Sequence, residues 1–190
     1  MQLYLIRHTR PALASSICYG QSDIDVADSF AADSLGLLTQ LHAVNADAVF
    51  TSPALRCQRL ADSLSPANWH SDHRLLELNF GAWELKSWDN IPRTELDYWS
   101  EDYVNRAPPG GESFQQLAER VRDWLEQLQQ LHAGQTLLVI THAGVIRALL
   151  AHALQLPLVN SFKLSLDYGC ISQLHLNQYG WQIACINRSI

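Results

Sequence analysis

The chain has 190 residues, a length that suits one compact domain and is too short for two ordinary domains with a linker. A hydrophobic content of 47% and a charged content of 17% are typical of globular proteins and exclude a disordered chain. The formal net charge of −6 argues against a nucleic-acid partner, whose phosphates require a positive surface. A small anionic substrate is still compatible, because a cleft can gather a few arginines on an acidic protein.

The apolar segments of the chain do not predict export or membrane insertion. The run at residues 2–6 is too short for the core of a secretory signal, so we expect a cytoplasmic protein. The most apolar stretch, residues 136–156, contains His142, Arg147 and His152, and this predicts a buried strand and helix rather than a membrane span. The four cysteines have no C-x-x-C spacing and predict small buried residues rather than disulfides.

Three apolar runs predict strands that are buried on both faces, at residues 2–6, 48–51 and 137–141. After the second run, Ser52 is the expected N-cap and Pro53 the first residue of a helix that reaches about residue 64. After the third run, a helix is expected from about residue 145 to residue 154.

The strongest helical period lies at residues 114–131, where apolar side chains recur every three or four residues. Ser113 and Gln116 fit a capping box at its start. Two apolar stretches between residues 170 and 187 predict a hairpin that turns at residues 177–180.

Strands that alternate with helices predict an α/β fold. We expect a three-layer sandwich in which a mostly parallel central sheet has helices on both faces. Residues 1–190 are expected to form a single domain. Residues 83–109 are rich in Trp, Asp, Asn and Pro and show no clean period, so we interpret them as an excursion over the sheet edge and a candidate lid.

Histidines and arginines follow the three predicted strands. Arg7 and His8 come after the first, Arg56 after the second, and His142 after the third. Each alone has an ordinary structural explanation, but ligands of α/β sheets bind at the carboxyl ends of the strands, where these four would meet. Arginine binds phosphate bidentately and neutral imidazole can attack phosphorus. Because no P-loop, dinucleotide fingerprint or metal-ligand set accompanies them, we predict a small phosphorylated substrate and neither cofactor nor metal.

The segment Leu5-Ile6-Arg7-His8 resembles the signature of the histidine phosphatase superfamily, also called phosphoglycerate mutase-like, and the resemblance covers nearly the whole chain. Four further blocks match in order: Thr51-Ser52-Pro53-Ala54-Leu55-Arg56, Leu76-Glu77-Leu78-Asn79-Phe80-Gly81-Ala82-Trp83-Glu84, Pro109-Gly110-Gly111-Glu112-Ser113 and Val139-Ile140-Thr141-His142-Ala143-Gly144-Val145-Ile146-Arg147. Residues 7–11 and 18–23 are similar to the branch that dephosphorylates α-ribazole 5′-phosphate during assembly of the cobalamin nucleotide loop.

The resemblance implies a role for each matched residue. His8 would be the nucleophile that is transiently phosphorylated, and Arg7, Arg56 and His142 would hold the phosphoryl oxygens. Glu77 would protonate the leaving alkoxide and then help to activate water. The cations of Arg7 and Arg56 favour the neutral His8 that attack requires. The substrate side would include Thr9, Arg10, Tyr19, Gly20 and Gln21.

The chain departs from the family pattern at a few positions. Thr9 and Arg10 stand where Gly and an acidic residue are usual, and Arg10 would either select the substrate or be a simple surface residue. Leu85 replaces the Gly that usually follows Trp-Glu, which leaves the conformation of that loop open. Leu60 replaces a Thr, and we expect only a change in packing.

Several functions share this pattern of residues. A phosphoglycerate mutase uses the same phosphohistidine, although residues 83–109 are short for a mutase lid and favour a phosphatase. A broad sugar-phosphate or nucleotide phosphatase would have the same pocket. A non-catalytic phosphate-binding module and a metal-dependent hydrolase are the rivals of other classes. No membrane partner is expected, and the chain would be a monomer or a homodimer.

Overall fold

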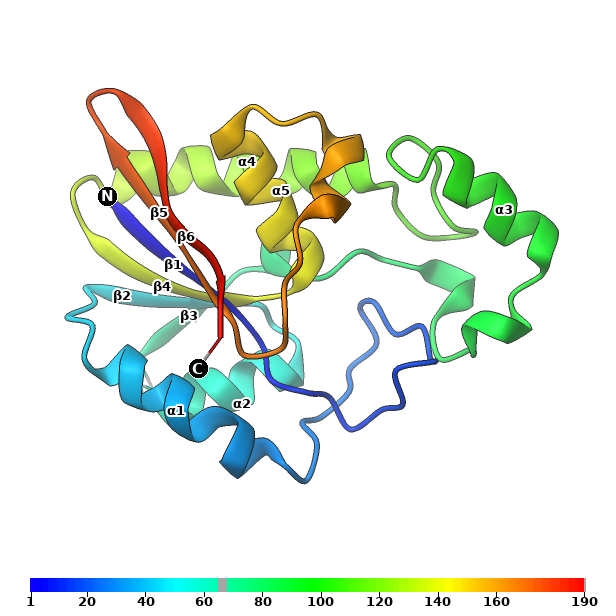
Figure 1. Cartoon of the computed structure of the whole chain (residues 1–190), viewed down its shortest axis with the longest axis horizontal. Coiled ribbons are helices and arrows are strands. Elements are labelled where there is room, and N and C mark those ends of the chain that lie inside the picture. The colour runs from blue at the N-terminus through cyan, green and yellow to red at the C-terminus, as the bar shows by residue number, and fades with distance from the viewer. Residues whose placement is uncertain (65–67, 190) are drawn as a thin grey trace.

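The computed structural model describes residues 1–64 and 68–189, and its centre is a six-stranded sheet (Figure 1). The strand order is β3-β2-β4-β1-β5-β6. The strands are β1 (Gln2–Arg7), β2 (Ala48–Thr51), β3 (Trp69–Ser71), β4 (Thr136–Thr141), β5 (Ile171–Asn177) and β6 (Gly180–Arg188). Strands β1 to β4 pair in parallel, whereas β5 and β6 form the predicted antiparallel hairpin at one edge. The short strand β3 was not predicted.

Helices cover both faces of the sheet (Figure 1). Helices α1 (Phe30–His42) and α2 (Leu55–Leu64) pack on one face, and α4 (Phe114–Leu131) and α5 (Ala143–Leu154) pack on the other. The predicted three-layer α/β fold with a mostly parallel sheet is therefore confirmed. Over the residues that the structure describes, no helix is both long and apolar enough to cross a membrane.

The central strands are apolar throughout because both of their faces are covered. In β1, Leu3 and Leu5 point to the core under α4 and α5, and Ile6 points to the core under α1 and α2. Strand β4 alternates in the same way, with Val139 and Ile140 on opposite faces. Successive side chains of a strand point to opposite faces, so each run supplies both cores.

Helix α4 begins with the predicted capping box. The Ser113 hydroxyl accepts from the Gln116 amide at 3.3 Å, and the Gln116 side-chain oxygen accepts from the Ser113 amide at 2.8 Å. The prediction for α2 was wrong in detail, because the helix starts at Leu55 and not at Pro53. Directly before the helix the Ser52 hydroxyl accepts from the Ala54 amide at 3.3 Å, and the Asp23 carboxylate accepts from the Leu55 amide at 2.7 Å.

Residues 83–109 extend away from the sheet and contain a helix that their irregular pattern did not predict, α3 (Arg93–Glu101; Figure 1). Trp83 and Ile91 form a small apolar cluster with Cys18, and the Cys18 amide and carbonyl both bond to the backbone of residues 85–86. The excursion therefore packs against the loop that follows β1.

The structure also contains short 3-10 helices. They are η1 (His73–Leu75), η2 (Gly81–Trp83), η3 (Trp88–Asn90) and η4 (Leu158–Lys163).

Candidate active site

The carboxyl ends of β1, β2 and β4 bring four predicted residues together. Arg7 ends β1 and His8 follows it, Arg56 lies in the first turn of α2, and His142 joins β4 to α5. His8, Arg56 and His142 are at most 1% exposed. The two imidazole rings lie edge to face with centroids 5.1 Å apart, and Nη2 of Arg56 is 3.3 Å from Nδ1 of His142.

The His8 ring is held in one tautomer by a single contact. Its Nδ1 lies 2.6 Å from the Thr9 carbonyl oxygen, which can only accept, so Nδ1 carries the hydrogen and Nε2 carries the lone pair. Burial, followed by the cations of Arg56 and Arg7, holds the pKa of His8 well below its usual value. The site therefore contains a neutral imidazole whose Nε2 is available as a nucleophile.

The Arg56 guanidinium is fixed by the loop that precedes α1. Its Nη1 donates to the Ser22 carbonyl at 3.0 Å and its Nη2 to the Gly20 carbonyl at 2.7 Å. Because Arg56 can only donate, Nδ1 of His142 accepts from it, and Nε2–H of His142 then donates to the Ser52 hydroxyl at 2.7 Å. Burial and the Arg56 charge hold the pKa of His142 well below its usual value.

Two tyrosines lie over the two arginines. The Tyr168 ring stacks on the Arg7 guanidinium at 3.7 Å, and the Tyr19 ring lies 5.1 Å from that of Arg56. The two phenol oxygens are 3.0 Å apart. Within residues 1–64 and 68–189, the buried Nε–H groups of Arg7 and Arg56 have no hydrogen-bond partner.

Glu77 lies on a loop two residues after η1 and contacts the start of α5. Its carboxylate accepts from the Leu78 amide at 2.9 Å and from the Gly144 amide at 3.2 Å. A Cβ atom at position 144 would overlap the Glu77 carboxylate, so this close approach requires glycine. The helix N-terminus and the carboxylate are thus held against each other.

A pocket of about 250 Å³ opens beside Glu77 and Gly144. Its charged lining comes from Arg7, Glu77 and Arg147, and Gly144 also lines it. Half of the remaining lining residues are aromatic: Tyr19, Phe80, Trp88, Phe114, Phe162 and Tyr168. This combination suits a ligand with a charged group next to a planar apolar group.

The five residues predicted for the substrate side do not all reach this pocket. Tyr19 and Gly20 line it. Gln21 instead supports Glu77, whose carbonyl accepts from the Gln21 side chain at 3.0 Å. Thr9 is fully buried beside a neighbouring hollow. Arg10 lies on that hollow too, is 64% exposed and pairs with Asp33, so the structure places it as a surface residue and not in the pocket.

Three residues of the site had no predicted role there. Tyr168 precedes β5, which runs antiparallel to β1, so its start lies beside the end of β1. Ser52 binds His142 although its sequence position predicted a helix cap. Arg147 stands four residues after Ala143 on α5, a spacing that places both on one face of the helix and could have indicated it.

The strand ends define an α/β protein with a buried histidine and arginine site for a small anion. Among the residues that the structure describes, no group of three or more His, Cys, Asp or Glu side chains is arranged to hold a metal ion. The family model of the histidine phosphatase superfamily (branch 1) matches residues 3–189, and the chain belongs to this superfamily. The predicted family resemblance is confirmed.

Individual relatives match along nearly their whole length. The adenosylcobalamin/alpha-ribazole phosphatase of Escherichia coli (strain K12) is 28% identical over 187 residues, 94% of this chain and 91% of that protein. The probable phosphoglycerate mutase GpmB of Cronobacter sakazakii is 28% identical over 189 residues, 95% and 87% of the two chains. The alpha-ribazole phosphatase structure from Shigella flexneri has a TM-score of 0.91 and 26% identity, and the match covers 99% of this chain and 96% of that one.

Proposed function

We propose that this protein hydrolyses a phosphate monoester through a phosphohistidine formed at Nε2 of His8. The observation that carries this proposal is the hydrogen bond from Nδ1 of His8 to the Thr9 carbonyl, which leaves the lone pair on Nε2. The imidazole is kept neutral by burial and by two guanidinium groups. A buried neutral nucleophile beside two cations is the arrangement that attack on a phosphate dianion requires.

In the first step, Nε2 of His8 attacks phosphorus and the bond from phosphorus to the ester oxygen breaks. The electron pair of that bond stays on the oxygen, which takes a proton from the Glu77 carboxyl. Arg7 and Arg56 hold the phosphoryl oxygens, and their unpartnered Nε–H groups gain acceptors when the phosphate binds. His142 orients Arg56 because its Nδ1 accepts from Nη2 of Arg56 at 3.3 Å.

In the second step, water attacks the phosphorus of the phosphohistidine. Its proton passes to the Glu77 carboxylate, the bond between phosphorus and Nε2 breaks, and the electron pair returns to the imidazole. Inorganic phosphate leaves and both residues regain their starting protonation states. The same carboxyl is thus the acid of the first step and the base of the second.

As the substrate we propose α-ribazole 5′-phosphate or its cobalamin-precursor form. The aromatic wall of the pocket suits a planar, weakly polar base next to the phosphate, and rings of this kind stack on aromatic side chains. Relatives with 26–28% identity are named as phosphatases of alpha-ribazole, which agrees with this choice. The mutase reading has support from the GpmB relatives, which are as similar to this chain.

The test is a phosphate-release screen in excess chelator with α-ribazole 5′-phosphate, phosphoglycerates, sugar phosphates and mononucleotides, run beside His8→Ala. We expect activity without added metal, the highest kcat/KM for α-ribazole 5′-phosphate, and an inactive variant. A variant as active as the unmodified protein would refute the covalent mechanism. Isomerised phosphoglycerate without net phosphate release would favour the mutase, and loss of activity in chelator would favour a metal-dependent hydrolase. Binding of phosphate without release from any ester would favour the non-catalytic module.

A further inference from the structure

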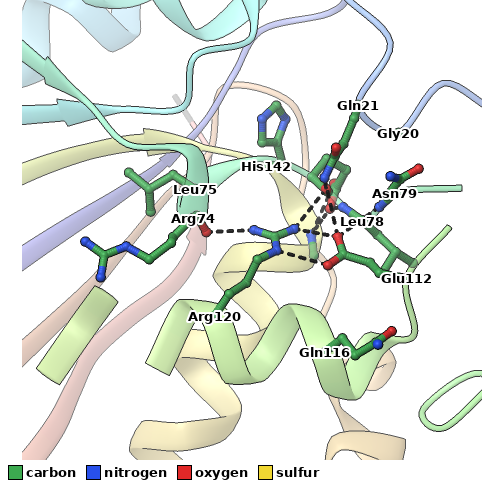
Figure 2. A network of polar contacts seen from close by, with 12 residues as sticks. Gly20, Gln21, Arg74, Leu75, Leu78, Asn79, Glu112, Gln116, Arg120 and His142 are labelled. Atoms are coloured by element: carbon green, nitrogen blue, oxygen red, sulfur yellow. Dashed lines mark hydrogen bonds and ion pairs between the residues drawn. The ribbon is translucent and has the colours of Figure 1, made fainter. Parts of the chain in front are cut away.

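Arg120 of α4 reaches across to the loop that carries Glu77 (Figure 2). Its Nη1 donates to the Arg74 carbonyl at 2.7 Å, and its Nη2 donates to the Glu77 carbonyl at 3.0 Å. The guanidinium therefore bonds to the backbone at Glu77 and three residues before it. Only 20% of the side chain is exposed.

Glu112, just before α4, completes this arrangement (Figure 2). Its carboxylate accepts from Nη2 of Arg120 at 2.7 Å and from Nε at 3.1 Å, a bidentate ion pair. The same carboxylate accepts from the Asn79 amide at 3.0 Å. The pair thus holds the backbone on both sides of Glu77, at residues 74 and 77 through the cation and at residue 79 through the anion.

A third side chain connects this pair to the substrate side. The side-chain Nε2 of Gln21 donates to the Glu77 carbonyl at 3.0 Å and lies 3.4 Å from the Glu112 carboxylate. The Glu77 carbonyl thus receives one bond from Arg120 and one from Gln21. Among the described residues, the Glu77 carboxylate is bound only by backbone amides, those of Leu78 and Gly144. The backbone of Glu77 is fixed independently of its reactive group.

The position of Glu77 explains why such an anchor matters. The residue lies outside every strand and helix, so no backbone ladder fixes it. A general acid must be held to within about 0.5 Å of its productive position relative to the leaving oxygen, and a loop seldom provides this alone. An ordinary helix-surface ion pair would direct its donors to its partner and to solvent. Arg120 instead uses two of its donors on the loop that carries the acid.

We propose that Arg120 and Glu112 are positioning residues that hold Glu77 in place for proton transfer to the leaving group. This inference rests on the proposed role of Glu77 as the general acid. It has a specific consequence, because an alkoxide must be protonated as it leaves and a nitrophenolate need not be. Disturbing the pair should therefore slow the cleavage of alkyl phosphates and spare p-nitrophenyl phosphate.

The experiment compares kcat/KM for an alkyl phosphate and for p-nitrophenyl phosphate, because kcat/KM reports the steps up to cleavage of the ester bond. For Glu77→Gln we expect a loss of about 10² to 10⁴ for the alkyl ester and less than about threefold for the nitrophenyl ester. For Arg120→Gln and Glu112→Gln we expect the same selectivity with a loss of roughly 10- to 100-fold for the alkyl ester. Arg120→Lys should be intermediate, because one ammonium cannot replace the planar fork.

The matched control is Arg122→Gln on the same helix. Arg122 pairs with Glu126 at 3.8 Å, both side chains are about half exposed, and neither bonds to the Glu77 loop. This control should leave both rates unchanged. Circular dichroism and thermal melts identify any variant that fails to fold. If Arg120→Gln does not fold, the isosteric Glu112→Gln is used for the test instead.

The outcomes separate the two proposals. Equal losses for both esters in folded Arg120 and Glu112 variants, with a selective loss in Glu77→Gln, would overturn the positioning role and leave the general acid intact. Equal losses for both esters in Glu77→Gln itself would overturn the role of Glu77 as the general acid, and the positioning role with it. Selective losses in all three variants would support both.

Discussion

The two walls of the active site are built in different ways. On the phosphate wall, Arg7 is the last residue of β1 and pairs in register with Thr141 of β4. His8 and His142 directly follow these two residues. On the wall that faces the leaving group, Glu77 and residues 19–22 belong to no strand or helix. Their backbone is held by side chains that come from far along the chain, among them Arg120 and Glu84.

Because of this difference, we expect the fold of the phosphate wall to tolerate single substitutions better than that of the leaving-group wall. A strand end is positioned by a ladder of backbone bonds and two packed cores, so no single side chain determines its place. A loop held by one carboxylate loses several bonds when that carboxylate changes, and its buried amides then lack partners. We therefore expect substitutions on the phosphate wall to remove chemistry and leave the fold intact, and substitutions on the leaving-group wall to affect both.

The largest effect is expected on the phosphate wall, in His8→Ala. Loss of the nucleophile should lower kcat by at least about 10⁴-fold, as for other covalent catalysts. The thermal melt should change little, and rapid quenching with labelled substrate should detect no acid-labile phosphoprotein. His42→Ala, at an exposed position of α1, is the control. A labelled His8→Ala protein would place the nucleophile elsewhere.

On the leaving-group wall, Glu84→Gln should affect activity and stability together. The Glu84 carboxylate accepts from three backbone N–H groups: that of Gln21 at 2.8 Å, that of Ser22 at 2.6 Å and that of Phe80 at 3.1 Å. An amide has only one oxygen to accept them, so we expect about 1–3 kcal/mol less stability and a displaced Arg56. The displaced Arg56 should separately lower kcat/KM by roughly 10- to 100-fold, because a small misplacement of a positioning group is costly.

Urea unfolding and steady-state kinetics measure the two effects of Glu84→Gln. The exposed Glu126→Gln, with the same change of charge, should alter neither. A Glu84 variant with full activity and stability would show that this wall is as robust as the phosphate wall.

The buried histidines of the phosphate wall predict a pH dependence of stability. In the unfolded chain, His8 and His142 titrate near pH 6.5, but burial and the Arg56 cation hold the pKa of each well below that value in the folded protein. Below pH 6.5 the unfolded chain binds more protons than the folded protein. For each histidine, the free energy of unfolding should therefore decrease by about 1.4 kcal/mol for every unit by which the pH is lowered. Urea unfolding between pH 7.5 and 5 measures the slope. His142→Gln should roughly halve it, and a flat profile would contradict this account.

The smallest expected effect is a gain from Leu85→Gly. Leu85 has a φ of 65° and a side chain that is 59% exposed, so the loop takes the left-handed conformation that glycine adopts without strain. Relief of about 1–2 kcal/mol of strain, less the entropy cost of glycine, should leave about 0.5–1 kcal/mol of added stability. Thermal melts test this. Leu85→Ala separates strain from side-chain packing and should show no gain.

Periodicity and motif order predicted the sheet apart from β3, helices α2, α4 and α5, the edge hairpin and the meeting of Arg7, Arg56 and His142 at one sheet edge. They could not predict α3, because a short amphipathic helix among Trp, Asp and Pro residues has no clear local period. They also could not tell whether Arg10 faces the pocket. Its ion pair with Asp33 of α1 turns it toward a separate hollow.

The sequence by itself determined the phosphate wall of this protein, because strand ends follow from local hydrophobic runs and parallel strands end at the same edge. Only the tertiary structure decided the leaving-group wall. Tyr168 covers Arg7, and Arg120 holds the loop of Glu77, across separations of more than forty residues. Such contacts depend on how whole layers pack and not on any local pattern, so they become visible only when the chain has folded.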